Sequence, residues 1–288
     1  MRNRRPLALA VLVAAAIPPL TAAASPDSAS PEQRLAGHPV GAWPRVTYPG
    51  PDAVREAQRF ASGWGDVSFA VIDTRRGLRG YEADRQYSSA SASKALLLAA
   101  ELRSLKEAGE PLDSGTRALL EAMITYSDND AGGGVYARVG DAGLEEVAER
   151  AGMRDFDVDP GFWGGAQITA ADMARFYYRL ERNLVGRYRD YGMALLADIT
   201  STQRWGIPAA AGGGWRVWFK GGWRPSGEEG TTGAVTHQAA LLVHRSGQRL
   251  GLAVLSNEAP GERGFAAIEG ITERLLAKPP RFGRWPSP

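Results

Sequence analysis

The sequence predicts an α+β fold in which an antiparallel sheet flanked by helices is interrupted by an all-helical insertion. Strand-like patterns occur between residues 67 and 82 and return after residue 215, with turn residues between successive strands. From about residue 91 to residue 197, apolar residues recur at helical spacing instead. A sheet built from both ends of the chain around such an insertion predicts two lobes with a cleft between them.

The first elements of the sheet lobe form a helix followed by a hairpin. The pattern of apolar residues predicts a helix over Asp52–Phe60. It is followed by two strand-like runs, Val67–Asp73 and Arg79–Glu82, joined by a turn at Arg75–Gly77.

The later elements follow the same two periodicities. Four helices are expected in the insertion, which contains no convincing strand: Ala95–Glu107, Gly115–Tyr126, Gly143–Ala151 and Ala170–Leu184. Three strands and a final helix then complete the sheet lobe: Trp215–Phe219, Ala234–His244, Arg249–Ser256 and Gly264–Leu276.

The composition allows a full core without cross-links. A chain of 288 residues with 44% apolar content can bury a large domain or two interleaved lobes. Cysteine is absent, which excludes disulfides, thiolate metal sites, a cysteine nucleophile and lipid attachment through an N-terminal cysteine. Stability must therefore come from packing.

The N-terminus is typical of an export signal. Three arginines precede the apolar run Leu7–Leu20, and Ala22–Ala24 offers a small-residue cleavage site. The run is short and contains two prolines, which disfavours a transmembrane anchor. We expect cleavage after residue 24, a secreted or extracytoplasmic protein, and no membrane span after cleavage. Loss of the three arginines changes the net charge from +2 to −1, so the charge gives no case for nucleic-acid binding.

The domain boundaries follow from these patterns. Ser/Pro/Ala-rich and Pro-rich stretches at the two ends of the mature chain predict flexible tails. The predicted organisation is a signal peptide at 1–24, a flexible segment at 25–48, a catalytic domain at 49–278 and a tail at 279–288, with a sheet lobe at about 49–90 and 202–278 and a helical lobe at about 91–201.

A serine and a lysine one helical turn apart give the first chemical signal. Ser91 lies where the strand-rich segment gives way to a helix, and Lys94 lies on the same face of that helix. A serine hydroxyl is a weak nucleophile until a base removes its proton, and a buried lysine with a pKa near ~7–8 can be that base. N–H groups in the first helical turn can stabilise an oxyanion. The pair predicts an acyl-enzyme site, although alone it is also typical of a helix cap and a solvated charge.

Two further motifs follow in order. Ser127-Asp128-Asn129 is typical of a loop between helices; its hydroxyl can relay a proton, and its carboxamide can hold both Lys94 and a substrate amide. Lys220-Gly221-Gly222 directly follows a predicted strand, whose edge can present backbone groups to a substrate while Lys220 supplies positive charge. Each motif alone is also typical of a cap or a turn, but the ordered trio favours an acylating site.

This trio resembles that of the class A serine β-lactamases and the penicillin-binding proteins. The stretches Ala122–Asp130 and Ile168–Ala174 are similar to the family's second motif and to the helix start after its omega loop. The resemblance covers roughly residues 50–278 and implies a β-lactamase/transpeptidase-like fold.

The resemblance also implies roles for individual residues. No metal or cofactor is implied, and the expected partner is a β-lactam or peptidoglycan-like small molecule bound by a monomer. The implied roles are Ser91 as the acylated nucleophile, Lys94 as its base, Ser127 as proton relay, Asn129, Gly222 and Trp223 as substrate contacts, Lys220 as support for Ser127 and a substrate carboxylate, and the backbone N–H groups of Ser91 and Trp223 as the oxyanion hole.

The most serious departure from the family pattern concerns deacylation. Class A enzymes carry an omega-loop glutamate that activates the deacylating water, whereas the corresponding segment here, Met153–Gln167, contains none. Asp155, Asp157 or Asp159 could substitute, but aspartates in a Gly/Pro-containing loop are also typical of turns. Fast deacylation is therefore in question.

Two smaller departures affect the substrate cleft. Gly221 replaces the Thr or Ser of the third motif and removes a hydroxyl, which Thr231 or Thr232 could supply only if the following loop folds back. The interval of 36 residues from Ser91 to Ser127 is shorter than the family usually has. It predicts an abridged helical lobe and a more open cleft.

Rival chemistries have little support. The sequence has no Gly-x-Ser-x-Gly elbow, no His-Glu-x-x-His and no phosphate loop. Its three histidines give little material for a Ser-His-Asp triad, and for His237 and His244 surface or sheet-packing roles are favoured. Trp163 and Trp223 could line an aromatic substrate site.

The sequence thus leaves three functions open. The first is hydrolysis of β-lactams through an acyl-enzyme on Ser91. The second is a D-alanyl-D-alanine peptidase or an esterase of the same fold. The third is a deacylation-deficient protein that binds β-lactams or the cell wall.

Overall fold

The computed structural model describes residues 47–75, 77–226, 233–258 and 260–278. The chain divides into two units, Met1–Gly37 and His38–Pro288, and every described residue belongs to the second. The expected leader, most of the expected flexible segment, the C-terminal tail, Thr231 and Thr232 lie outside the described residues. The expectations about them therefore stay predictions.

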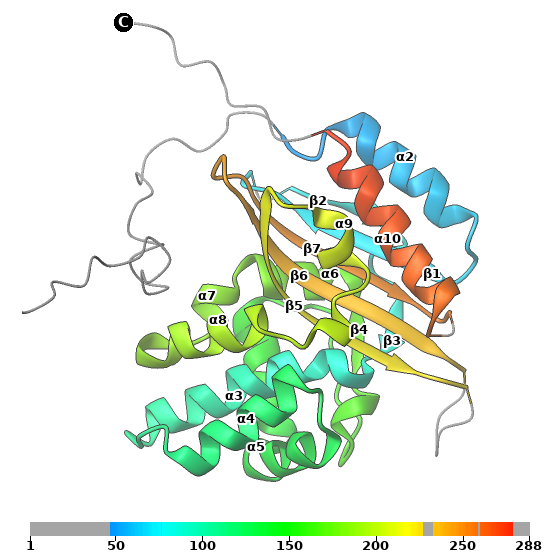
Figure 1. Ribbon diagram of the computed structural model, residues 1–288. Helices are drawn as coiled ribbons and strands as arrows, with labels where there is room; N and C mark the ends of the chain where they lie inside the picture. The colour runs from blue at the N-terminus through cyan, green and yellow to red at the C-terminus, as the bar shows by residue number, and fades with distance from the viewer. Residues whose placement is uncertain (1–46, 76, 227–232, 259, 279–288) are drawn as a thin grey trace, which may run out of the picture. The chain divides into compact units, whose positions relative to one another are not determined.

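A five-stranded antiparallel sheet is built from both ends of this unit (Figure 1). Its strand order is β2-β1-β7-β6-β5, so β5 forms one edge. The inner strands are almost wholly buried, because helices cover both faces of the sheet. The strands are β1 (Val67–Ile72), β2 (Leu78–Tyr81), β5 (Trp215–Arg224), β6 (Val235–His244) and β7 (Arg249–Ser256).

Two groups of helices pack on the sheet. Helix α10 (Glu262–Leu276) contacts β6 and β7 and lies beside α2 (Pro51–Ser62) and α9 (Ile207–Ala211) (Figure 1). Helix α6 (Ala170–Tyr178) contacts β1, β6 and β7. A Cβ at Gly251 of β7 would lie 2.2 Å from a carbonyl oxygen of α6. The backbone of α6 therefore packs directly against the backbone of β7 at this glycine.

The remaining helices form the insertion in the lower part of Figure 1. Helix α3 is buried along most of its length and contacts α4, α5 and α8, as expected for the central helix of a cluster. These helices are α3 (Lys94–Glu107), α4 (Ser114–Thr125), α5 (Asn129–Ala151), α7 (Leu180–Asn183) and α8 (Arg189–Ala197), accompanied by 3₁₀ turns at Ala90–Ser93, Trp163–Gly165, Gly186–Tyr188 and Ser201–Gln203.

The α+β prediction is confirmed, but the structure differs from the local expectations in five places. The insertion contains a strand, β4 (Gln167–Thr169), which pairs with β3 (Gln86–Ser88). Strands of three residues are too short to show an alternation of apolar and polar residues in the sequence. The expected helix ending at Leu184 breaks at Arg179. The helix expected from Gly143 is present, but α5 also includes an unexpected helical stretch from Asn129, separated from it by a kink at Gly140, where φ is 62°.

The other two differences fall on the motifs. Lys220-Gly221-Gly222 lies inside β5 instead of at its end, because backbone pairing with β6 continues to Arg224. Ser91 lies in the 3₁₀ turn that precedes α3, and not in the helix itself.

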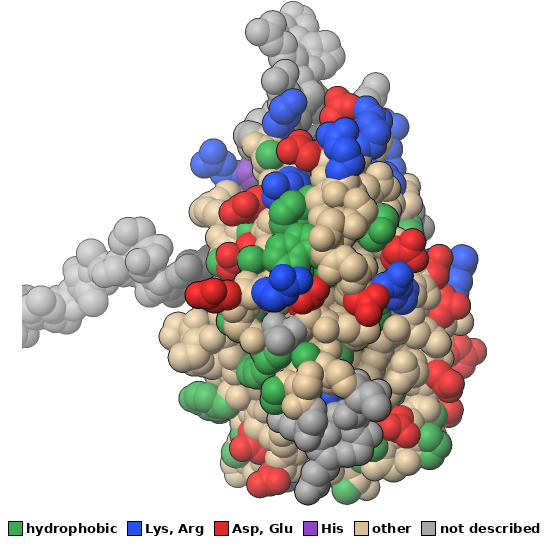
Figure 2. All heavy atoms as spheres, turned by 90° about the vertical axis from the view of Figure 1, so that its right-hand side faces the viewer, with side chains coloured by type: hydrophobic (Ala, Val, Ile, Leu, Met, Phe, Trp, Pro, Cys, Tyr) green, Lys and Arg blue, Asp and Glu red, His purple; other side chains and the backbone are tan. Residues whose placement is uncertain are grey.

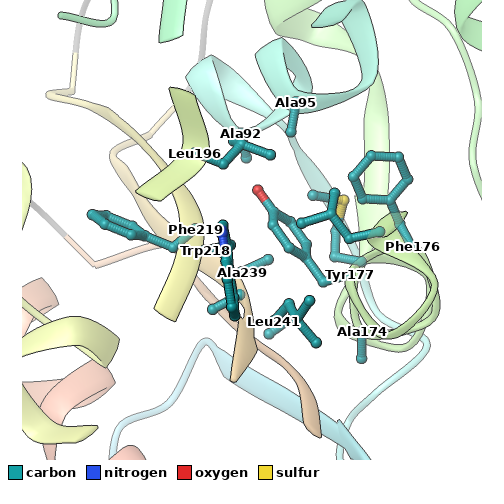
Figure 3. Packing of buried hydrophobic residues seen from close by; sticks show 14 of the residues in the cluster. Ala92, Ala95, Ala174, Phe176, Tyr177, Leu196, Trp218, Phe219, Ala239 and Leu241 are labelled. Atoms are coloured by element: carbon teal, nitrogen blue, oxygen red, sulfur yellow. The ribbon is translucent and has the colours of Figure 1, made fainter. Parts of the chain in front are cut away.

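The core packs directly beneath this turn. Figure 3 shows the ring of Tyr177, from α6, among apolar side chains, with its hydroxyl directed toward Ala92 and Ala95. Tyr177 is fully buried, and its hydroxyl has no hydrogen-bond partner within the described part of the chain. Burial raises the pKa of this hydroxyl, so it stays protonated. The turn and the first residues of α3 are thus seated on the central core.

The visible surface carries mixed charge. Figure 2 shows acidic and basic side chains interspersed on the face that lies to the right in Figure 1, where α2 and α10 run. Residues 47–278, apart from the gaps given above, include no helix with the length and apolarity needed to cross a membrane. Over the same residues, no cluster of three or more His, Asp or Glu side chains is arranged to hold a metal ion.

Candidate active site

Ser91 is presented by a turn with unusual backbone geometry. It is partly exposed and follows Ala90, whose φ of 43° lies in the left-handed region that non-glycine residues rarely adopt. The Ser93 hydroxyl donates to the Ala90 carbonyl at 2.9 Å and helps to hold the turn. Such strain, maintained by the surrounding structure, is typical of functional sites.

Strand β5 lies against the same turn. A Cβ at Gly222 would lie 2.5 Å from the Ala92 nitrogen, 2.9 Å from the Ser91 nitrogen and 2.8 Å from the Ser89 oxygen. Only glycine allows the strand to approach this closely. The contact brings Gly222, the neighbour of Trp223 in the chain, to the nitrogen of Ser91. The predicted oxyanion hole of the Ser91 and Trp223 N–H groups stays a prediction.

Lys94 is buried at the start of α3 and bonded to the second motif. Its Nζ donates to the Ser127 carbonyl at 2.6 Å, to Asn129 Oδ1 at 2.8 Å and to Ser127 Oγ at 3.4 Å. Burial lowers the pKa of Lys94 to about 8, although the Asp128 carboxylate opposes part of the shift. A substantial fraction of Lys94 is therefore neutral near pH 8 and can accept a proton.

Lys220 approaches the same hydroxyl from the sheet. Its Nζ donates to Ser127 Oγ and to the Gly221 carbonyl, both at 3.0 Å. Burial, and then the positive charge of Lys94, lower the pKa of Lys220. Ser127 itself has φ of 62°, in the left-handed region, and this strained backbone places its hydroxyl between the two lysines.

The start of α5 is shaped to admit this cluster. The Asp128 side chain caps the helix by accepting from the Ala131 nitrogen at 2.7 Å. A Cβ at Gly132 would lie 3.0 Å from Lys94 Cε and 3.3 Å from the Trp163 ring. Gly132 was not among the predicted site residues, although the glycine run after Ser127-Asp128-Asn129 was a signal for such close packing.

The structure therefore assembles most of the predicted residues. Lys94, Ser127, Asn129 and Lys220 form one hydrogen-bonded network, and Gly222 touches the turn that carries Ser91. The Ser91 hydroxyl has no hydrogen-bond partner among the residues that the structure describes, so the expected contact with Lys94 is not made in this state. Catalytic hydrogen bonds are often long before substrate binds. The catalytic and binding roles themselves stay predictions.

The segment before β4 contributes an indole to the site. Trp163 lies against Lys94, with Nζ 4.8 Å from the ring centroid. Asp155, Asp157 and Asp159 are exposed. Within the described ranges, no carboxylate is a hydrogen-bond or ion-pair partner of Lys94. This segment therefore places an aromatic ring beside Lys94.

Aromatic side chains also border the third motif. Trp223 meets Trp205 edge to face at 5.9 Å, and Trp205 stacks on Phe265 at 4.1 Å. Tyr126 and Phe162, which precede Ser127 and Trp163 in the chain, are the large apolar side chains that remain exposed among the described residues. These rings offer apolar surface beside the polar network.

His237 is fully buried and has a structural role. Burial lowers the pKa of His237 to about 4, so the ring is neutral. One ring nitrogen contacts the Ser88 carbonyl at 3.0 Å, and Nδ1 accepts from the Ser256 nitrogen at 3.1 Å. His237 thereby ties β6 to β7 and to the strand that leads into the Ser91 turn.

Comparisons with known proteins agree with this geometry. The model of the beta-lactamase enzyme family matches residues 105–278, more than half of the chain; this span includes Ser127, Asn129 and Lys220 and begins after Lys94. None of the curated proteins matches the chain.

Solved structures show the same fold. PBP-A is 18% identical with a TM-score of 0.67 and is matched over 80% of this chain and 98% of its own. A beta-lactamase from Sphaerobacter thermophilus is 20% identical (TM-score 0.65; 78% and 95% covered), and an ancestral class A beta-lactamase is 22% identical (TM-score 0.66; 78% and 99% covered). From the matched family model and this shared fold, the chain belongs to the beta-lactamase enzyme family.

Proposed function

We propose that the protein is a serine hydrolase that opens β-lactam amides through an acyl-enzyme on Ser91. The observation that carries the proposal is the Ser127 hydroxyl, held between two buried lysines of which Lys94 has a pKa of about 8. Two buried amines around one hydroxyl are costly to maintain for stability alone. They suit a site that must move protons at neutral pH.

The acylation step follows from these contacts. Neutral Lys94 accepts the Ser91 proton while Ser91 Oγ bonds to the lactam carbonyl carbon, and the N–H groups of Ser91 and Trp223 stabilise the oxyanion. When the carbon–nitrogen bond breaks, the Ser127 hydroxyl protonates the leaving nitrogen. Lys94, now charged, returns its proton to Ser127 across their 3.4 Å contact. The step ends with a Ser91 ester and neutral Lys94.

Deacylation distinguishes two candidate functions. Water must attack the Ser91 ester, and in this proposal neutral Lys94 is the base that activates that water. The ring of Trp163, 4.8 Å from Lys94 Nζ, and the exposure of the three segment aspartates favour a second candidate, in which the acyl-enzyme is long-lived and the protein binds β-lactams without rapid turnover.

One experiment tests the proposal and separates the candidates. The full chain is mixed with a chromogenic cephalosporin while product formation and intact-protein mass are followed together. Steady turnover with a transient adduct supports the hydrolase. A stoichiometric burst with a stable adduct supports the binding protein. No adduct and no turnover would rule out acylation by β-lactams and leave the peptidase or esterase alternative.

The pH dependence of acylation should follow Lys94. Its folded pKa of about 8 lies below its ordinary value, and the neutral form is the base, so the acylation rate should increase with pH and level off above about 8. At pH 7 about one-tenth of Lys94 is neutral, so an approximately fivefold increase is expected between pH 7 and pH 8. Stopped-flow acylation rates from pH 5.5 to 9.5 provide the measurement. A rate that is flat through this range would exclude Lys94 as the titrating base.

A further inference from the structure

A polar cavity lies at the far end of α3 from Lys94. It has a volume of about 430 Å³ and forms where the C-terminal ends of α3 and α5 meet α7. Along α3, twelve residues separate Lys94 from Lys106, or about 18 Å at 1.5 Å per residue. Five cationic side chains line the cavity: Arg103, Lys106, Arg150, Arg179 and Arg182.

The five cationic side chains of this cavity carry more positive charge than the neighbouring negative groups neutralise. Glu146 pairs with two of the five, at 2.7 Å from Arg150 Nε and 3.8 Å from Arg103 Nε. The C-terminal ends of α3 and α5 each contribute the equivalent of about half a negative charge. A net positive charge of roughly three therefore remains around the cavity.

Helix capping explains only part of this cluster. Arg179 donates to the carbonyl of Ala151, the last residue of α5, at 2.9 Å, which is ordinary capping. Lys106 and Arg182 have neither a hydrogen bond nor an ion pair from their side chains to any described residue. Arg103 is 9% exposed, and its Nε has no hydrogen-bond partner within the same part of the chain. The exposed Lys106 and Arg182 side chains are therefore available to a ligand.

We propose that this cavity binds a small phosphate-bearing anion. Its volume lies in the range of small-molecule sites, and guanidinium groups match the geometry of phosphate oxygens. Arg103 contributes a largely buried positive charge to the lining, while Lys106 and Arg182 contribute exposed charged donors. The site is separate from Ser91 and does not depend on the proposed reaction.

Calorimetric titration of the full chain at constant ionic strength tests this site. The probes are inorganic phosphate, pyrophosphate and glycerol phosphate. We expect saturable binding with one site per chain. Comparable or tighter binding of glycerol phosphate than of the inorganic ions assigns the site to a phosphate ester, and the reverse order assigns it to free phosphate. Absence of saturable binding for all three probes would overturn the proposal.

Matched variants separate this site from general charge attraction. In Lys106→Gln/Arg182→Gln, binding should be at least about tenfold weaker, because two charged donors are lost. The control Arg189→Gln/Arg216→Gln removes two exposed charges that do not line the cavity and should bind like the parent chain. Both double variants should keep the circular dichroism spectrum of the parent chain. Equal affinity in the two double variants would mean that no defined site exists.

Discussion

The Ser91→Ala variant should form no covalent adduct with a β-lactam and should lose hydrolysis by about 10³-fold or more. The change removes the only atom that can hold the acyl group in the proposed mechanism, while the turn and the lysine network stay in place. Intact-protein mass after mixing with a chromogenic cephalosporin measures the adduct, and absorbance measures the turnover.

Ser93→Ala provides the matched control in the same turn. Its hydroxyl donates to the Ala90 carbonyl and is buried, so its loss should reduce the free energy of unfolding by about 1 kcal/mol while the adduct still forms. An adduct that persists in Ser91→Ala, or disappears only in Ser93→Ala, would show that the nucleophile is assigned wrongly.

Gly222→Ala should damage the site as severely as the loss of an oxyanion-hole donor, which costs about 10²–10³ in rate. The new Cβ would lie 2.5 Å from the Ala92 nitrogen and 2.9 Å from the Ser91 nitrogen, so β5 must move away from the turn. The same overpacking should lower the free energy of unfolding by about 1–3 kcal/mol. Acylation rates and chemical denaturation measure the two effects.

Gly221→Ala, one residue earlier on β5, is the control for this prediction. At Gly221 the nearest atoms to an added Cβ, on Gln238 and His237, lie at 3.4 Å, which is ordinary contact. This variant should keep its acylation rate within about threefold and its stability within about 1 kcal/mol. Similar losses in both variants would contradict a specific role for the approach of β5 at position 222.

The fold was largely predictable because the apolar patterns that indicate its main strands and helices extend over many residues. The runs that became β1, β6 and β7 are rich in apolar residues and bounded by turns, and α3 begins with an unbroken apolar run, Ala95–Ala100. The pairing of β3 with β4 was missed because each strand has three residues, and their contact joins positions about eighty residues apart.

The candidate site was predictable as a set of residues but not as a geometry. Motif order identified Lys94, Ser127 and Lys220, and the structure places them in one network. The left-handed backbone of Ser127 and the position of Trp163 beside Lys94 depend on tertiary packing, for which local sequence gives no signal. The lowered pKa of Lys94 likewise arises from burial that only the folded chain creates.

The pairing of β3 with β4 allows the helical segment between these two strands to vary in length. It joins the two ends of the segment between Ser89 and Ala166, which are also bonded directly through the Ser89 nitrogen and the Ala166 oxygen at 2.8 Å. A segment closed at its base can change length at its far end at little entropic cost, because loop-closure entropy varies only logarithmically with length. Shortening within it leaves the anchor points of Ser91 in place. The brief interval of 36 residues between Ser91 and Ser127 is thus compatible with an intact lysine network.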